Sequence, residues 1–380
     1  MTSSRPPGTK PRKQEQEDAS TEVTEVAPGV LRMQLPIKFS GLGHVNCYAL
    51  EDGDGFTIVD PGMPGPQNWK ALLDRLGRAG TGIEHVHGVV VTHSHPDHFG
   101  GAGKVRVESG ARVISSTTFR TWFDPVTDGD DVVEDPDASG EAAAVLREEA
   151  DERPPPLPKF TGRETPWGGK HPMPPLAFRI RMKVLGPLRK RWMVPPKPSV
   201  RLADADTIVL AGREWVSVHT PGHTSDHLCL YDPTEGVLLA GDHVLPTITP
   251  HIAGHSGPRS VADGEAGSDP LADFFTSLDK VAALDGVTTV LPAHGHPFHD
   301  LAARTEAIKA HHVERLDILR QASEGLGEAT VEELSHELFR QRSWGPMADS
   351  ETYAHLEHLR LGGEVESRRV DGLLRYKLVS

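Results

Sequence analysis

Four side chains that can bind a metal lie within six residues of this 380-residue chain, at His93, His95, Asp97 and His98. The apolar run at 88–92 precedes them and is typical of a buried strand. A strand that ends in a turn can direct alternating side chains into one pocket. Imidazole and carboxylate donors together suit zinc, iron or manganese. The segment therefore predicts a metal site at the carboxyl end of a strand.

Three later segments repeat this design, because in each a strand-like run ends at another side chain that can bind a metal. His223 follows the alternating run at 215–219 and a Pro-Gly turn, Asp242 follows the apolar run at 237–241, and His294 follows the apolar run at 290–292. With 21 histidines in the chain, one imidazole alone carries little weight, and a solvated loop would explain His-x-His by itself. Four strand ends that each deliver a donor favour a shared metal site over that alternative.

These motifs resemble, in order and spacing, those of the metallo-β-lactamase-fold hydrolases over about residues 21–300. The chain looks most similar to the glyoxalase II-like branch, and within it to members that carry a C-terminal winged helix. The resemblance implies two divalent metal ions as cofactors, with zinc ahead of iron and manganese. It implies a full set of ligands: His93, His95 and His223 for the first ion, Asp97, His98 and His294 for the second, and Asp242 bridging both.

A binuclear site of this kind predicts a hydrolase that needs no serine or cysteine nucleophile. One ion lowers the pKa of bound water toward ~7, and a pair ~3.5–4 Å apart can share a hydroxide that attacks a carbonyl or phosphoryl centre. Asp97 is the candidate catalytic residue, because its carboxylate could orient that hydroxide and accept its proton. The leading prediction is hydrolysis of a carboxylic thioester, ester or lactone, as in hydroxyacylglutathione hydrolases. A metal-dependent endoribonuclease or phosphodiesterase is the main alternative, followed by a β-lactam hydrolase and a non-catalytic regulator.

Metal-bound imidazoles usually donate their second N–H to a carboxylate or carbonyl, so supporting residues are expected around the site. Asp60 is the first candidate, because it ends the strand-like run 55–59 before a Pro-Gly turn, where the resembling family has an aspartate. A simple turn aspartate would also explain it. Asp226, His227 and His243 adjoin expected ligands but are weaker candidates, since neighbours on a strand point to opposite faces. His251, in the loop at 247–255, is either a substrate contact or an ordinary loop histidine.

The metal motifs require strands to position them, and apolar periodicity predicts these elements. Strands are expected at 23–26, 30–35, 45–50, 56–59, 111–115, 200–210, 214–219, 228–231 and 236–240. Helices are expected at 69–76 and 271–284. Two halves that each combine strands, a ligand and helices indicate an α/β (α+β) fold, and the family resemblance implies a four-layer αββα sandwich.

Residues 120–200 depart from the family pattern and are interpreted as an insertion that covers or rims the site. Twelve acidic residues and one basic residue occupy 124–152, whereas twelve basic residues and one acidic residue occupy 153–201. A short helix is expected at 139–149. The mixed charged and apolar segment at 179–194 is either a lid packed through its aliphatic stems or a mouth for an anionic, partly apolar substrate such as an acyl thioester of a phosphorylated carrier. Contact with a membrane surface or RNA is a third alternative.

The region 301–380 predicts a separate winged-helix domain after a catalytic domain at 21–300. Helices are expected at 300–321, 331–339 and 350–361, and the Asp371-Gly372 pair predicts a hairpin turn after them. The third helix has no cluster of Lys or Arg, which argues against insertion into a DNA groove. A structural role is preferred, as a side wall of the active site or a contact in a homodimer.

Composition limits the cellular setting and the partners. Residues 1–20 lack the apolar core of a signal peptide and are predicted to form a disordered tail, so the cytoplasm is the expected location. A membrane span is not expected, because no run of 18 apolar residues occurs. Cys47 and Cys229, the only two cysteines, lie in strand-like runs and are predicted to be buried thiols. The expected partner is a small anionic or acyl substrate. A net charge of −14 argues modestly against nucleic acid, which stays an alternative because net charge says little about a local groove.

Overall fold

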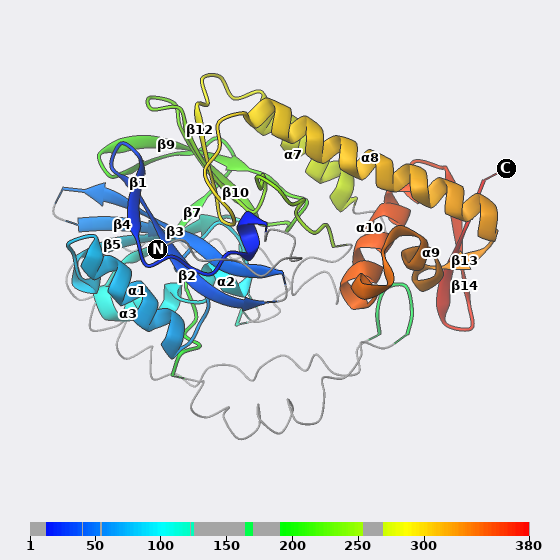
Figure 1. The fold of residues 1–380 in the computed structure, drawn as a ribbon, viewed down its shortest axis with the longest axis horizontal. Helices are drawn as coiled ribbons and strands as arrows, with labels where there is room; N and C mark the ends of the chain where they lie inside the picture. The colour runs from blue at the N-terminus through cyan, green and yellow to red at the C-terminus, as the bar shows by residue number, and fades with distance from the viewer. Residues whose placement is uncertain are drawn as a thin grey trace, which may run out of the picture.

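The computed structural model of the chain describes residues 13–39, 41–53, 55–121, 123–124, 164–169, 191–253 and 269–379. Its main body contains two β-sheets with helices on their outer sides (Figure 1). The expected α/β (α+β) fold, a four-layer αββα sandwich, is therefore confirmed.

The first sheet contains seven strands in sequence order. Neighbouring strands are antiparallel from β1 to β4 and parallel from β4 to β7. Its strands are β1 (Val23–Ala27), β2 (Val30–Phe39), β3 (Leu42–Asp52), β4 (Gly55–Val59), β5 (Val86–Val90), β6 (Arg112–Ser116) and β7 (Val200–Leu202).

The second sheet has the strand order β12-β11-β10-β9-β8. Strands β11 and β12 are parallel, and the other neighbours are antiparallel. Its strands are β8 (Thr207–Leu210), β9 (Arg213–His219), β10 (Leu228–Asp232), β11 (Val237–Gly241) and β12 (Thr289–Pro292).

Alternation along the strands explains why two sheets and two helical layers pack together. On β3, Cys47 packs in the apolar layer beneath the helices α1 (Pro66–Arg78) and α3 (Ala102–Ser109), whereas Tyr48 packs between the two sheets. On β11, Leu239 lies between the sheets and Leu238 faces the layer that includes α7 (Pro270–Ala282) and α8 (Leu301–Leu326). A period of two sends successive side chains to opposite faces, so both faces of these strands are buried. Both cysteines are buried free thiols, as predicted.

The prediction that residues 1–20 form a disordered tail is wrong for residues 13–20. Residues 13–20 lie against the body of the protein and include the short 3-10 helix η1 (Gln14–Gln16). The Glu15 carboxylate is fully buried and accepts hydrogen bonds from the backbone N–H (3.1 Å) and the hydroxyl (2.6 Å) of Thr247. Sequence composition misled here because a buried carboxylate with hydrogen-bond donors from 232 residues away leaves no local signal.

The prediction of one continuous strand at 200–210 is also wrong, because this stretch contains two strands, β7 and β8, that belong to different sheets. The intervening Ala-Asp-Ala-Asp sequence forms a turn in which Ala205 has a φ of 65°. The Asp206 carboxylate accepts a hydrogen bond from the backbone N–H of Ala203 at 2.7 Å, which stabilises the turn.

Most of the expected insertion lies outside the described residues, including the helix predicted at 139–149 and residues 179–190 of the mixed segment. The short stretch 164–169 is described and packs against the C-terminal region. The Trp167 ring lies 5.3 Å from that of Tyr353, and the Trp167 carbonyl accepts a hydrogen bond from the Leu374 N–H at 2.8 Å.

The C-terminal region consists of the long helix α8, the helices α9 (Val331–Leu338) and α10 (Pro346–Leu361), and a small sheet of order β13-β15-β14. Its strands are β13 (Ala329–Thr330), β14 (Val365–Val370) and β15 (Leu373–Leu378). The predicted hairpin turn is confirmed, with positive φ at Asp371 (50°) and Gly372 (83°). We call α8 to α10 with β13 to β15 the C-terminal module; α8 connects it to the sandwich (Figure 1). Among the helices described, none is both long and apolar enough to cross a membrane.

Candidate metal centre

The predicted metal-binding side chains come from four loops that each follow a strand. These loops follow β5, β9, β11 and β12, two of which belong to the parallel pair β11–β12. The two sheets are joined at this edge, because the Asn46 amide on β3 donates hydrogen bonds to the carbonyls of Pro292 and Gly295, each at 2.8 Å. A direct backbone bond from Leu228 to the Thr92 carbonyl, at 2.9 Å, joins them again. The loops therefore have a fixed relative position.

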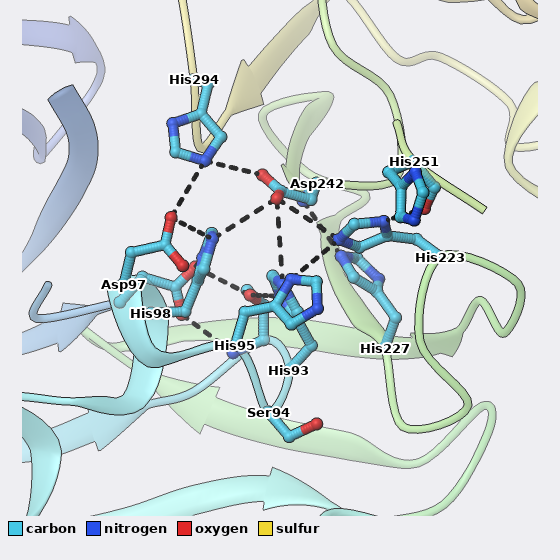
Figure 2. A network of polar contacts seen from close by, with 12 residues as sticks. His93, Ser94, His95, Asp97, His98, His223, His227, Asp242, His251 and His294 are labelled. Atoms are coloured by element: carbon cyan, nitrogen blue, oxygen red, sulfur yellow. Dashed lines mark hydrogen bonds and ion pairs between the residues drawn. The ribbon is translucent and has the colours of Figure 1, made fainter. Parts of the chain in front are cut away.

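The histidine-rich turn begins where β5 ends, two residues earlier than predicted, and leads into the short helix α2 (Pro96–Phe99). His95 is the residue before this helix, and Pro96 occupies its first position, where proline is favoured because it needs no hydrogen-bond acceptor for its nitrogen. Asp97 and His98 then follow in the first helical turn, so the change from strand to helix brings them to the same pocket as His93 (Figure 2).

His223 is directed inward by the Pro-Gly turn that precedes it. Gly222 has a φ of 134°, and a Cβ added to it would lie 2.4 Å from the Cβ of Phe274 on α7. Only glycine allows the backbone to pass α7 this closely in that conformation.

The donor atoms form two adjacent groups. One contains His93, His95, His223 and Asp242, the other contains Asp97, His98 and His294, and within each group the donor atoms lie within 4.8 Å of one another. The seven predicted ligands are thus brought together from four loops (Figure 2).

Asp242 lies between the two groups. Its Oδ2 is 3.8 Å from His93 Nε2 and 3.5 Å from His223 Nε2, which belong to the first group. The same oxygen is 3.4 Å from His98 Nε2, and Oδ1 is 3.3 Å from His294 Nε2, which belong to the second. A carboxylate that faces both groups has the position that a bridging ligand requires.

Asp97 lies at the more open side of the second group. Its Oδ2 is 3.6 Å from His98 Nε2 and 3.5 Å from His294 Nε2. Its side chain is 18% exposed, compared with 9% for Asp242. Of these two carboxylates, Asp97 is the one that solvent reaches more easily.

Four of the five imidazoles contact a polar group outside the ligand set through Nδ1, whereas Nδ1 of His95 lies 3.1 Å from Nε2 of His223. His93 contacts the Thr92 hydroxyl at 3.0 Å, and His98 contacts the Asp60 carboxylate at 2.9 Å. His223 and His294 contact backbone carbonyls, those of His251 at 2.7 Å and His44 at 2.8 Å. An imidazole that donates from Nδ1 presents the lone pair of Nε2, so these contacts turn the metal-binding nitrogens toward the centre of the pocket.

Asp60 lies behind the histidine-rich turn and is almost fully buried. Its Oδ1 accepts a hydrogen bond from the Thr92 N–H at 2.9 Å, and its Oδ2 accepts one from the Thr92 hydroxyl at 2.7 Å in addition to that from His98. Asp60 therefore supports two neighbouring imidazoles, His98 directly and His93 through Thr92.

The electrostatics of the pocket favour a positive charge inside it. Burial alone would raise the pKa values of Asp97 and Asp242, but the imidazoles of His98 and His294 keep both below the usual range. Burial lowers the pKa of His95 to about 3, so that this ring is neutral. Although burial opposes it, Asp242 raises the pKa of His294 to about 10. Protons on the imidazoles of the second group thus balance the negative charge of the carboxylates. A bound cation can supply this positive charge in place of the protons.

The donor set fits a divalent cation. Among the seven candidate ligands, four buried atoms that could bind a metal have no hydrogen-bond partner: the Nε2 atoms of His93, His98 and His294, and Oδ1 of Asp242. Buried polar atoms in native proteins are usually paired, so a cluster of unpaired atoms facing one space indicates that something else binds there. Imidazole nitrogen and carboxylate oxygen are ligands of zinc and of other transition metals.

Several neighbours of the site were underestimated from the sequence. The His227 ring accepts a hydrogen bond from the Asp242 N–H at 3.0 Å, and Asp226 accepts one from the Ser94 hydroxyl at 3.1 Å. The rule that strand neighbours point apart fails because residues 220–227 form a loop rather than a strand. His251 contributes its backbone carbonyl to the site, and its ring contacts Glu351 instead.

Comparison with known proteins gives a consistent family. Residues 40–296 match the family model described as the metallo-beta-lactamase superfamily. The chain is 24% identical over 278 residues to the probable metallo-hydrolase YqjP of Bacillus subtilis, covering 73% of this chain and 75% of that protein. It is 27% identical over 152 residues to an atrochrysone carboxyl ACP thioesterase of Aspergillus fumigatus, covering 37% of this chain and 32% of that protein.

Similarity to a solved structure extends further. The fold matches the metallo-beta-lactamase family protein TTHA1429 from Thermus thermophilus with a TM-score of 0.67 and 28% identity. The match covers 93% of this chain and 100% of that one, so it includes the C-terminal module as well as the sandwich.

Proposed function

The chain belongs to the metallo-β-lactamase superfamily, and from this membership and the pocket geometry we propose a binuclear metal-dependent hydrolase that cleaves a carboxylic thioester, ester or lactone. The observation that carries the proposal is the position of Asp242, whose two oxygens face two adjacent groups of imidazoles. Two donor groups that share one carboxylate suit two cations better than one.

We assign the ligands by group. His93, His95 and His223 would hold the first ion, Asp97, His98 and His294 the second, and Asp242 both. When bound, the ions supply Lewis acidity, which lowers the pKa of water and polarises the substrate carbonyl. Zinc is the preferred metal, with iron and manganese as alternatives, because nitrogen and oxygen donors accept all three.

Asp97 is the proposed catalytic residue. Neighbouring His98 and His294 keep its pKa below the usual range despite burial, so it is a carboxylate near neutral pH. An acceptor at the more open side of the pocket can orient a water molecule and accept its proton when the carbonyl is attacked. Buried Asp60 would keep the Nδ1 proton of His98 in place during this step.

The proposal of a thioester or related substrate rests on two observations. The order of the motifs resembles that of the glyoxalase II-like branch, and one partial relative is named as a thioesterase. We further propose that the C-terminal module is a winged helix with a structural or protein-contact role. Its helix α10 carries the acids Glu351, which is buried, and Glu357, which is partly buried, both already paired with arginines, and this disfavours contact with nucleic acid.

Metal analysis combined with a substrate panel tests the function. The purified full chain is expected to contain two equivalents of divalent metal and to hydrolyse one member of a panel of thioesters, esters and lactones, with RNA as a comparison. Asp97→Asn should lower kcat by at least about 100-fold, the order of effect of a lost acid–base group. Asp279→Asn, an exposed carboxylate on α7, is the matched control. Cleavage of RNA together with no hydrolysis of any thioester, ester or lactone, or a chain that binds no metal, would contradict the proposal.

A further inference from the structure

A continuous set of contacts connects the C-terminal module to His223. The Nδ1 of His223 donates to the carbonyl of His251 at 2.7 Å. The Nδ1 of His251 then lies 3.1 Å from Oε2 of Glu351 on α10, and Oε1 of Glu351 accepts a hydrogen bond from Arg315 on α8. The candidate ligand is thus linked to the two helices through a single backbone carbonyl.

The segment that carries this carbonyl is held by contacts with other parts of the chain, including the hydrogen bonds from Thr247 to Glu15. Residues 246–253 follow β11 and have no helix or strand conformation. They are held from α8, because the Arg304 guanidinium donates to the carbonyls of Leu245 at 2.6 Å and Ile248 at 2.7 Å. Glu351 adds the contact nearest to the site, since it binds His251 itself.

The contact with Glu351 is largely shielded from solvent. The side chains of Glu351, Arg315 and His251 are 11%, 18% and 23% exposed. A hydrogen-bonded charge pair with this degree of burial has a defined geometry and fixes its neighbours, because an alternative arrangement would leave a charge unpaired.

We propose that Glu351, held by Arg315, is a positioning residue for His223, and that the C-terminal module thereby sets the metal affinity of the site. This inference rests on the proposed function, because it requires His223 to be a ligand. Removal of Glu351 releases the His251 ring, the carbonyl at 251 moves, and the His223 ring loses the acceptor that orients its Nε2. Partners of metal-bound histidines typically contribute about 10–100-fold to metal affinity.

The same residues could instead form a separate metal site, because donor atoms of His312, Glu351 and His355 lie within 4.8 Å of one another. The hydrogen bonds favour the positioning role. His355 contacts the Glu351 carbonyl through Nδ1 (2.7 Å) and His312 Nδ1 through Nε2 (3.0 Å), so a single proton on each Nδ1 satisfies both contacts. Both oxygens of Glu351 are already used by Arg315 and His251.

Zinc affinity of the full chain, measured by chelator competition, tests the inference. Glu351→Ala and His251→Ala should each weaken binding of one zinc ion by at least about 10-fold. The double variant should be no weaker than the single variants, because both changes break one contact. Glu351→Gln, which keeps an acceptor oxygen, should recover part of the affinity. Glu357→Ala is the control, since it removes a carboxylate on the same helix that binds Arg360 and Tyr376 and not His251.

The outcomes separate the inference from the function. Wild-type protein that binds no zinc would overturn the proposed function. Wild-type protein that binds two ions, together with unchanged affinity in Glu351→Ala, would overturn the inference alone, as would additive losses in the double variant. A third zinc ion that His312→Leu abolishes would also overturn it in favour of a separate site. If Glu351→Ala does not fold, His251→Ala decides the question, because its backbone and the Arg315–Glu351 pair remain.

Discussion

Replacement of Asp60 by asparagine tests the support behind His98 in a quantitative way. Asparagine has the same shape and tolerates the positive φ of 54° found at this position, so the backbone should remain unchanged. Its amide oxygen can still accept from the Thr92 N–H, but its NH₂ group replaces the oxygen that accepts from His98. The Thr92 hydroxyl can rotate and become an acceptor, whereas His98 is left with a buried N–H that faces another donor.

Two effects follow from this unpaired donor. Leaving a buried donor unsatisfied costs about 1–3 kcal/mol, which should appear in the free energy of unfolding of the metal-free protein. If the His98 proton moves to Nε2 instead, the nitrogen that faces Asp97 and Asp242 no longer has a lone pair. Affinity for one of the two ions should then fall by about 10–100-fold, equivalent to about 1.4–2.7 kcal/mol.

Urea unfolding in the presence of a chelator and zinc competition measure these effects separately. Asp232→Asn is the matched control, because Asp232 is also fully buried and accepts two backbone hydrogen bonds, but lies on β10 at the Arg213 pair. The control should lose stability and keep its zinc affinity. If Asp60→Asn binds both ions as tightly as the wild type, the reasoning about His98 is refuted.

Three other predictions concern the same region. Chelation of the metal should lower the free energy of unfolding by about 2.7 kcal/mol relative to protein in free zinc at 100 times the dissociation constant. A melting temperature that does not change with zinc would contradict this prediction. Gly222→Ala should shift α7 away from the 220–223 turn, because the new Cβ would lie 2.4 Å from Phe274, and both the zinc affinity and the melting temperature should fall. The control is Gly212→Ala, which also has a positive φ but no atom within 4 Å of the new Cβ, and which should lower stability without changing zinc affinity. In Glu351, burial raises the pKa, but the hydrogen bond from His251 and the charge of Arg315 outweigh it and lower the pKa to about 2 from 4.5. Because the folded pKa is the lower one, this carboxylate stabilises the fold above about pH 4.5 by about 3 kcal/mol, and the contribution is lost as the pH falls toward 2. The difference in unfolding free energy between wild type and Glu351→Gln, measured with chelator present, should therefore become smaller as the pH falls from about 4.5 to 2. A difference that stays constant over this pH range would contradict the prediction.

The strands and the convergence of the seven donors could be predicted because both have local signals. Apolar residues on both faces of β3 and β11 indicate strands that are buried on both sides. Each metal-binding side chain follows the end of a strand, and the loops after these strands lie close together. Helices α1 and α7 were predicted from their apolar stripes and begin at Pro66 and Pro270, within a few residues of the expected starts.

The supports of the site could not be predicted in this way, because their partners are distant in sequence and polar. Glu15 binds Thr247, and Glu351 binds His251 one hundred residues earlier. No periodicity reports a hydrogen bond between a carboxylate and a loop that only the folded topology brings near. Two of the imidazoles are oriented by the backbone carbonyls of His44 and His251, which any residue type at those positions could provide.

The packing of residues 13–20 against the body of the protein has a consequence for folding during synthesis. The Glu17 carbonyl contacts the His44 ring, and the Gln14 side chain accepts a hydrogen bond from the His296 N–H at 3.1 Å. Gln14 is synthesised 282 residues before its partner His296. A nascent chain would therefore carry the histidine-rich turn and the His44 carbonyl before His294 is synthesised. Metal loading would be a late event, and a purification tag fused directly to residue 13 would disturb the site more than one placed upstream.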